Sequence, residues 1–486
     1  MTSPLLTPDL PPSSAASPPV MPARPSLLTL GPLVAVALML ATIAVVLFDK
    51  IAPSLPLAVV GGVGLIALVG LTVARYEAAV FLGFLLSGVV KIEPAPPDGI
   101  FAVIIAVAIV TGRLRVDRVP APIAATLAAL VALNVLSFAA ATNISDGIRF
   151  AAITLYVAVF SVWLAGYADR DSRGRGIVVA WLIIAVFSAI VGTLALQLPS
   201  FPFRLELIAD GSSRASALFK DPNVYGPFLV PIAVIVLEEM IAPRLLRIRM
   251  ATGFVILAVL IIGLIFSFSR AAWANMLLST AVMLAILLLR RRHTGRLVVV
   301  LGGLGIVGMV VMAVVVFSGQ ADFIGQRAQL QQYDSERFGA QRAGVEIASH
   351  YPLGVGPGQF MYHHPVESHS TYVRVLAEQG PLGLALWLTL CLLTLGLAIG
   401  NAFAGRTSAG IGSAALLGAW CGLLFNSVVV DTLHWRHLWV VLGLIWAGAM
   451  IGQARRPGDP GPISLTEPGP RYEPPKLTPV VPVSRD

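Results

Sequence analysis

The chain has 486 residues, of which 57% are hydrophobic and only 12% carry a charged side chain, and its formal net charge is +8. Soluble domains carry about 25% charged residues, so this composition excludes a soluble globular protein and indicates a polytopic membrane protein. In a membrane protein an excess of basic residues mostly reports topology, so the net charge is no sign of nucleic-acid binding. The two cysteines, Cys391 and Cys421, both fall within apolar runs, which excludes a disulfide framework.

Apolar segments long enough to cross a membrane recur along the chain. A bilayer core of about 30 Å needs about 20 apolar residues per helix, and on that measure about fourteen spans are expected. The third, fourth and last are short. The expected spans are 29–48, 55–74, 78–91, 99–112, 119–141, 150–168, 176–196, 223–242, 250–268, 271–289, 297–318, 380–400, 409–430 and 437–452. The predicted fold is therefore all-α, a bundle of about 12–14 transmembrane helices.

Composition shifts divide the chain into five segments. Residues 1–26 are rich in proline and serine and 453–486 are rich in proline, so both are expected to be disordered cytoplasmic tails. Between them, 27–318 would hold the first spans and 380–452 the last ones. The intervening 319–379 is the longest polar interruption of the chain, and we expect it to form an extracytoplasmic loop with short helices and the catalytic chemistry.

Arginines gather in every second connection between the expected spans. With a cytoplasmic N-terminus, the opposite connections carry single cations such as Lys91 and Arg149. By the positive-inside rule both termini are then cytoplasmic and the loop at 319–379 lies outside the cytoplasm. The arginine runs are Arg113, Arg115 and Arg118; Arg170, Arg173 and Arg175; Arg244, Arg247 and Arg249; Arg290, Arg291, Arg292 and Arg296; and Arg455 and Arg456.

The long loop contains two patterns that point to chemistry. Gly354-Val-Gly-Pro-Gly-Gln-Phe360 predicts a turn built on glycine. His369-Ser-Thr-Tyr372 predicts the start of a short helix, with His369 in its opening turn and Gly380-Pro381 as its end. The positive end of a helix disfavours imidazolium, so a neutral histidine is expected there. A neutral imidazole can take a proton from a hydroxyl group.

Two arginines are expected on the same side of the membrane as His369. Arg214 precedes Asp221-Pro222-Asn223, which predicts the turn that starts the eighth span. Arg270 interrupts two apolar spans with almost no loop around it, and an ionisable residue at membrane depth indicates function. The planar guanidinium binds phosphate oxygens through two hydrogen bonds at once. Arg214, Arg270 and His369 therefore predict transfer chemistry on a lipid diphosphate, in which the arginines stabilise the departing diphosphate.

Further polar residues fall on the same predicted side. Lys220, Asn223, Tyr372 and Arg436 are candidate substrate-binding residues, although for Lys220 and Arg436 a topology signal or a lipid-headgroup contact is favoured over substrate binding. A compact group with some metal-ligand character consists of His363, His364, Glu367 and His369. The tight spacing and an intervening proline disfavour a shared tetrahedral site, so no metal and no cofactor are expected.

Taken together, the motifs resemble those of the O-antigen ligase and O-antigen polymerase family of integral membrane glycosyltransferases. The resemblance covers about 205–385, and no single motif in it is specific. Its parts are Arg214 with Asp221-Pro-Asn223; Ser269-Arg270-Ala-Ala-Trp273; Gly354-Val-Gly-Pro-Gly-Gln-Phe360; His369-Ser-Thr-Tyr372; and Glu378-Gln-Gly-Pro-Leu-Gly383.

The resemblance implies a GT-C-like fold in the bacterial inner membrane. It also implies metal-independent glycosyl transfer from an undecaprenyl diphosphate-linked glycan on the extracytoplasmic face. Arg214 and Arg270 match the family's diphosphate-binding arginines, and His369 matches its proposed base. The expected partners are the lipid-linked donor, a lipid or glycan acceptor and membrane lipids, without nucleic acid.

Three functions remain open from the sequence. The leading one is an inverting ligase that moves a glycan to an acceptor hydroxyl in surface polysaccharide synthesis, of which lipopolysaccharide is an example. The second is a polymerase that joins repeat units at the same site. The third is a transporter or flippase of lipid-linked sugars, which the few charged residues inside the spans, such as Glu238 and Glu239, disfavour.

Overall fold

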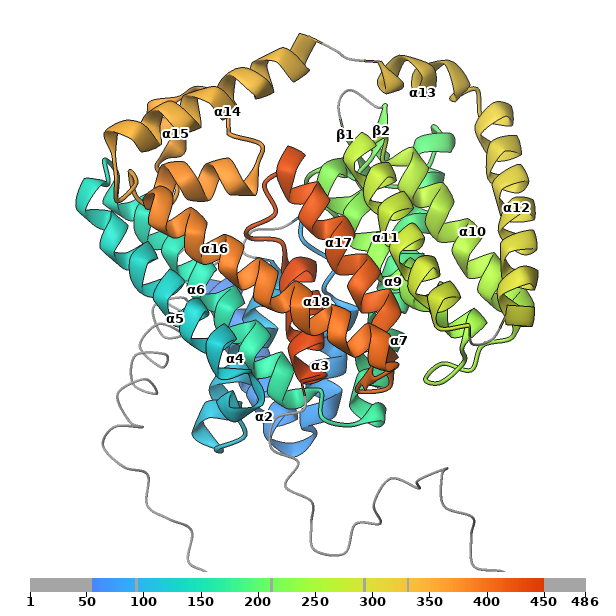
Figure 1. The fold of residues 1–486 in the computed structure, drawn as a ribbon, viewed down its shortest axis with the longest axis horizontal. Helices are drawn as coiled ribbons and strands as arrows, with labels where there is room; N and C mark the ends of the chain where they lie inside the picture. Colours follow the sequence, from blue (N-terminus) through green and yellow to red (C-terminus); the bar gives the residue numbers. More distant parts are fainter. Residues whose placement is uncertain (1–54, 92–94, 210–212, 292–293, 330–331, 450–486) are drawn as a thin grey trace, which may run out of the picture. The chain divides into compact units, whose positions relative to one another are not determined.

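The computed structural model describes residues 55–91, 95–209, 213–291, 294–329 and 332–449. The first expected span, at 29–48, and both expected tails lie outside these residues. The described residues form seventeen α-helices and almost no sheet, which makes this an all-α polytopic membrane protein as predicted (Figure 1). Seven helices are long and apolar enough to cross a membrane, and six further apolar helices are shorter.

The long apolar helices are α5 (Ala121–Leu136, continued by the 3-10 turn Ser137–Ala140), α6 (Ile144–Tyr167), α7 (Asp171–Gln197), α9 (Pro222–Ile241), α11 (Arg270–Leu289), α12 (Thr294–Phe317) and α16 (Thr371–Ala404). The shorter apolar segments are Val63–Ala74 within α2 (Leu55–Ala74), α3 (Tyr76–Leu85), α4 (Pro96–Val110), α10 (Met250–Phe266), α17 (Ser413–Val429) and α18 (Arg436–Ala447). They agree closely with the spans expected between 55 and 449.

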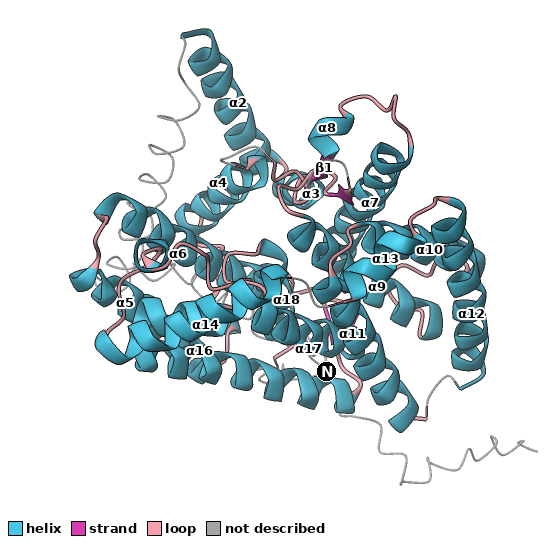
Figure 2. Ribbon diagram, turned by 90° about the horizontal axis from the view of Figure 1, so that it is seen from above, coloured by secondary structure: helices cyan, strands magenta, loops and turns pink. Residues whose placement is uncertain are grey.

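Small elements occupy the connections. Two-residue strands form two antiparallel pairs, β1 (Ile208–Ala209) with β2 (Arg214–Ala215), and β3 (Thr407–Ser408) with β4 (Ile411–Gly412). A four-residue helix, α8 (Arg204–Leu207), precedes β1. The long polar loop contains α13 (Ala321–Ala328), α14 (Gln332–His350) and α15 (Phe360–His363). Figure 2 shows α14 lying beside α16, with which it is in contact.

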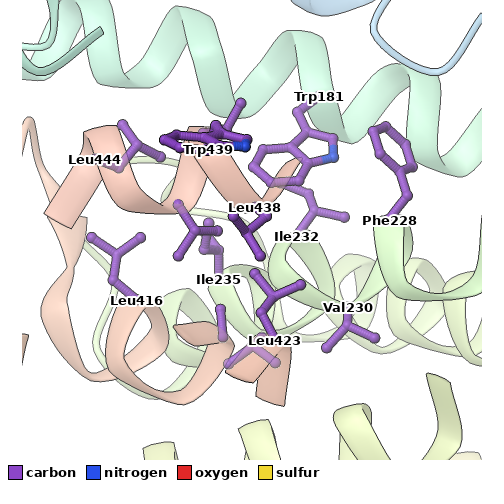
Figure 3. Close-up of a cluster of buried hydrophobic side chains, with 14 of the residues drawn as sticks. Trp181, Phe228, Val230, Ile232, Ile235, Leu416, Leu423, Leu438, Trp439 and Leu444 are labelled. Atoms are coloured by element: carbon purple, nitrogen blue, oxygen red, sulfur yellow. The ribbon is translucent and has the colours of Figure 1, made fainter. Parts of the chain in front are cut away.

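Helix α9 lies at the centre of the bundle and packs against α7, α10, α11 and α17. It is buried along almost its whole length, which explains why it is apolar on every face. Figure 3 shows part of this core, where Ile232 and Ile235 of α9 meet Trp181 of α7, Leu423 of α17 and Trp439 of α18.

Glycines bring α11 and α17 close together. A Cβ added at Gly418 would lie 2.3 Å from the Ser279 carbonyl oxygen, and one at Gly422 would lie 2.1 Å from the Asn275 side-chain oxygen. Because helices in lipid gain little from hydrophobic burial, small residues four apart that permit close packing are a main source of helix association. This pair of helices carries Arg270 at one end of the interface.

The connections separate into two groups at opposite ends of the helices. At one end the arginine-rich connections meet, and Gly174 of α7 packs directly against Ala409 between β3 and β4. At the other end, α13, α14 and α15 lie on the same side as β1 and β2 (Figure 1). There Gln359 binds the backbone of Asn143, so the long loop is attached to the start of α6. The candidate residues are found at this second end.

Candidate active site

Arg214 lies in β2, and its side chain links β2 to the start of α9 and to the end of α10. Its side chain is buried, its Nε donates to the Ser267 carbonyl at 3.0 Å, and its Nη2 donates to the Asn223 side-chain oxygen at 3.0 Å. Asn223 is the second residue of α9, and Ser267 directly follows α10. The predicted turn at the start of the eighth span is confirmed, because Asp221 caps α9 by accepting from the Asn223 N–H at 2.7 Å.

Arg270 is the first residue of α11, directly after the N-cap residue Ser269. Its Nη2 lies 2.5 Å from Asp334 Oδ1, and its Nη1 donates to the Gln329 carbonyl at 3.0 Å. Asp334 belongs to α14, so the long loop folds back onto the start of α11. Because Arg214 bonds to Ser267, three residues before Arg270, the two arginines are attached to the same short α10–α11 connection.

His369 is half-buried and precedes the helix that it was expected to open. Helix α16 begins at Thr371, and Ser370 is its N-cap residue, accepting from the Val373 N–H at 3.5 Å. His369 itself has left-handed backbone geometry, with φ of 44°. The prediction of an opening-turn position was therefore wrong by two residues, because the serine, whose hydroxyl caps helices well, takes the N-cap position.

The pKa of His369 lies below its ordinary value. Burial of the imidazole is the largest cause, and the guanidinium of Arg337 lowers the pKa further, while the carboxylates of Asp221 and Asp431 act in the opposite direction. A neutral imidazole was predicted, but from the helix dipole. The physical cause is instead the loss of solvent around the ring together with a neighbouring positive charge.

Asp221 and Arg337, which act on the His369 pKa, also lie close to the partners of Arg214 and Arg270. Asp221 caps α9 two residues before Asn223, the partner of Arg214. Arg337 lies one helical turn after Asp334, the partner of Arg270, on the same helix. The three residues predicted from the sequence are thus gathered at one end of the helix bundle, by contacts between segments far apart in the chain.

A buried charged network surrounds the side chain of Arg374, in the first turn of α16, and the sequence did not predict it. Arg374 Nε lies 3.2 Å from Glu378 Oε2, and a second nitrogen of Arg374 pairs with Asp431. The guanidinium carbon also lies 4.8 Å from the centre of the Phe150 ring. Although burial acts to raise the pKa of Asp431, the guanidinium of Arg374 holds that pKa below its ordinary value.

Hydroxyl groups extend this network to the start of α16. The Thr432 N–H donates to Thr371 Oγ1 at 2.7 Å, and the two threonine hydroxyls lie 3.0 Å apart. The Ser370 hydroxyl donates to the Ser427 carbonyl at 3.4 Å. The α17–α18 connection, which carries Asp431, therefore fixes the backbone that holds His369.

The glycine turn predicted at 354–360 is confirmed, and it packs against the end of the short helix that begins at Thr371. The Val355 N–H donates to the Ala377 carbonyl at 3.0 Å, and the Gly356 N–H donates to the Glu378 carbonyl at 3.0 Å. Gly354 has φ of 80°, and a Cβ there would lie 2.2 Å from the Glu378 carbonyl carbon. A glycine is therefore required for both conformation and close approach.

The helix break predicted at Gly380 is also present. Gly380 has φ of 72° and ψ of −178° inside α16, so the helix is divided into a short part over 371–379 and a long apolar part after it. A Cβ at Gly380 would lie 2.1 Å from the Pro352 carbonyl oxygen. The expected boundary between the loop and the last spans falls at this break.

The remaining candidates are held by protein contacts or exposed. Lys220 is exposed, close in sequence to the start of α9. The Tyr372 hydroxyl donates to the Leu424 carbonyl at 3.0 Å, which attaches it to α17. Arg436 pairs with Asp98 at the start of α4, with its Nε 2.5 Å from Oδ1. Asn223 accepts from Arg214, as described above.

The side chains of His363 and His364 make separate contacts within the loop. His363 packs against the Tyr351 ring, with centroids 5.5 Å apart, and His364 Nδ1 accepts from the Val366 N–H at 3.2 Å within its own loop. Among the described residues, no three His, Cys, Asp or Glu side chains are grouped so that they could hold a metal ion.

Some of the missed residues carried a weak signal in the sequence. Arg374 and Glu378 are four apart, which is the spacing of an ion pair on one helix face. Asp334 and Arg337 are polar residues of the long loop with nothing in the local pattern to single them out. Asp334 reaches Arg270, and Arg337 comes close to His369, only because α14 folds back onto the start of α11.

Comparison with known proteins gives one result for this site. The family model described as O-Antigen ligase matches residues 255–388. This range contains Arg270, Asp334, Arg337, the glycine turn and His369, whereas Arg214 and Asp431 lie outside it. A search of curated proteins finds no match for the chain.

Proposed function

Residues 255–388 belong to the O-antigen ligase family, and from this membership we propose a specific reaction for the chain. The family supports an O-antigen ligase-like or polymerase-like function in surface polysaccharide synthesis. We propose that the protein moves a glycan from an undecaprenyl diphosphate-linked donor to an acceptor hydroxyl. The observation that carries the proposal is the gathering of Arg214, Arg270 and His369 at one end of the helices.

In the proposed reaction His369 acts as the general base. Its neutral imidazole accepts the proton of the acceptor hydroxyl while the hydroxyl oxygen attacks the anomeric carbon of the donor sugar. A new carbon–oxygen bond forms as the bond between that carbon and the diphosphate oxygen breaks. The bonding electrons leave with undecaprenyl diphosphate, and attack from the opposite side inverts the anomeric configuration. The depressed pKa of His369 supports this role because it keeps the ring unprotonated near neutral pH.

Arg214 and Arg270 are proposed to bind the diphosphate. Negative charge grows on the diphosphate oxygens as the bond to the sugar breaks, and charge-assisted hydrogen bonds from guanidinium groups stabilise that charge most strongly at the transition state. Asp334 supports the role of Arg270 by holding its guanidinium at a fixed position on α11. Arg337, whose charge acts on His369, adds a third cation near the same point.

The proposed site faces the extracytoplasmic side of the bacterial inner membrane. The support is the distribution of arginines, which are concentrated in the connections at the end of the helices opposite His369. In this orientation the long loop, with α13 to α15, covers the site from outside. A cysteine introduced at Ser349, an exposed residue at the end of α14, should then react in intact spheroplasts with a membrane-impermeant maleimide, and labelling only after lysis would contradict the orientation.

Deletion of the gene, followed by complementation, tests the proposed function. The deletion strain should lose glycan transfer to its surface acceptor, and the wild-type gene should restore it. Gel profiles of the surface polysaccharide then separate the two enzyme alternatives. Complete lipid-linked polymer without its acceptor identifies a ligase, and loss of the ladder to single repeat units identifies a polymerase. An unchanged profile would contradict both.

Transport of lipid-linked sugars has less support. Among the described residues, Glu238 and Glu239 are buried near the opposite end of α9. Glu238 accepts from the Ala415 N–H at 2.6 Å, and Glu239 accepts from the Leu245 N–H at 3.0 Å. Their carboxylates therefore bind the backbone of neighbouring connections, which argues against a charged path through the bundle.

A further inference from the structure

A cavity of about 680 Å³ opens at the end of the helices opposite the candidate active site. It lies between α3, the connection that follows α4, the end of α6 and the connection between α6 and α7. Nothing in the proposed reaction uses this cavity. Its lining combines aromatic rings with four arginines.

The aromatic part of the lining is rigid. Trp163 and Tyr167 on α6 are buried, and their rings stack with centroids 5.3 Å apart at an interplanar angle of 16°. The Trp163 indole N–H donates to the Tyr76 hydroxyl at 2.7 Å. Tyr76 and Tyr167 also contact one another, with centroids 6.0 Å apart. These contacts preform one wall of the cavity.

Two guanidinium groups lie against these rings. The Arg113 guanidinium carbon is 5.0 Å from the centre of the Tyr76 ring, and that of Arg173 is 4.8 Å from the centre of the Tyr167 ring. Cation–π contact of this kind holds a guanidinium plane in place. It still allows the N–H groups at the edge of the plane to donate hydrogen bonds to an oxyanion.

Acidic residues neutralise only part of the positive charge. Arg173 pairs with Glu77 at 3.1 Å and with Asp169 at 2.9 Å, and Arg115 pairs with Asp117 at 2.9 Å. The two other arginines of the lining, Arg75 and Arg113, make no ion pair within the part of the chain that the structure describes. Unneutralised positive charge therefore remains beside the aromatic wall.

We propose that this cavity binds the phosphate group of an anionic ligand, and that the ligand is the glycerophosphate headgroup of an anionic phospholipid. Arg75 and Arg113 would donate to the phosphate oxygens. Tyrosine and tryptophan favour the level of the lipid headgroups, and basic pockets between helices at the cytoplasmic side suit anionic headgroups. An arginine that only sets topology needs no preformed cavity beside aromatic rings.

A bound headgroup would connect three separate parts of the chain. Arg75 precedes α3, Arg113 and Arg115 lie between α4 and α5, and Arg173 is near the start of α7. A phosphate shared among them would fix these connections relative to one another. The inference does not depend on the transfer reaction, because the cavity and the candidate active site are at opposite ends of the helices.

The test uses purified, delipidated full-length protein titrated with phosphatidylglycerol or phosphatidylcholine and observed by native mass spectrometry. Phosphatidylglycerol should bind more tightly than phosphatidylcholine. The double substitution Arg75→Gln, Arg113→Gln should weaken phosphatidylglycerol binding about 25-fold, about fivefold for each arginine. The control is Arg296→Gln, which removes an exposed arginine outside the cavity and at the same end of the helices, and it should leave binding unchanged.

Competition by inorganic pyrophosphate identifies the source of the phosphate. Weak competition supports the phospholipid headgroup, whereas displacement of phosphatidylglycerol at low concentration supports the phosphate site but assigns it to a soluble ligand. Equal binding of the two lipids, or wild-type binding by the double variant, overturns the proposal. Should the double variant fail to fold, Arg75→Gln alone provides the test, because this side chain is exposed, and it should weaken phosphatidylglycerol binding about fivefold.

Discussion

At the scale of single residues, His369 is placed between opposing charges. Arg337 lowers its pKa and Asp221 and Asp431 raise it, with burial as the largest influence. None of these neighbours is adjacent to His369 in the sequence. The histidine could be predicted as a candidate from its loop, but the set of charges that tunes it could not, because it comes from three distant segments.

The pH dependence of transfer should follow these charges. If neutral His369 is the base, kcat/KM should rise with pH as His369 loses its proton. The midpoint of this rise, the acid limb of the profile, should lie below the ordinary pKa of histidine. Arg337→Gln removes a cause of the low pKa, so the acid limb should move to higher pH. Asp221→Asn removes a cause that raises the pKa, so the limb should move to lower pH.

The measurement is the pH profile of kcat/KM for glycan transfer by the purified variants. Displacement of the acid limb to higher pH in Arg337→Gln and to lower pH in Asp221→Asn would support the assignment of the base. Identical profiles for the wild type and both variants would contradict it. Changes in overall rate without displacement would show that these residues act on the substrate and not through His369.

At the scale of elements, the loop is organised by the contact between the glycine turn and the short helix over 371–379. The positions of the turn and of the break at Gly380 were predictable, because glycine and proline mark them directly in the sequence. The docking of the turn on the helix was not, because it depends on hydrogen bonds from Val355 and Gly356 to carbonyls more than twenty residues away.

Gly354→Ala should disrupt this contact. The added Cβ would lie 2.2 Å from the Glu378 carbonyl carbon, and the positive φ adds strain of about 1–3 kcal/mol. We expect faster hydrogen exchange over 351–380 and reduced transfer, with normal insertion in the membrane. Gly339→Ala is the matched control, since nothing lies within 4 Å of a Cβ at that helical position. Wild-type exchange in Gly354→Ala would refute the docking role.

At the scale of the whole molecule, the positions of the apolar spans in the sequence could be predicted. Which spans pack against one another could not. The length and hydropathy of each helix are local properties, and so α9 and α11 agree with the expected spans to within a residue. The close packing of α11 on α17 depends on Gly418 and Gly422 meeting Ser279 and Asn275. Such pairings are set by the folded bundle and carry no unique local signal.

In the proposed reaction Arg214 and Arg270 bind the donor diphosphate and His369 activates the acceptor. Donor binding and single-turnover transfer by purified protein in nanodiscs separate these roles. Arg214→Gln and Arg270→Gln should each weaken donor binding by about 10- to 100-fold, the effect of losing hydrogen bonds to a charged group. His363→Ala, which changes an exposed histidine of the same loop, should alter neither measurement.

The rate of the single turnover in His369→Ala tests the proposed general base most directly. This variant should bind the donor as the wild type does and transfer its glycan about 100- to 10,000-fold more slowly, because general base catalysis is lost. Transfer by His369→Ala at the wild-type rate would show that His369 is not the base.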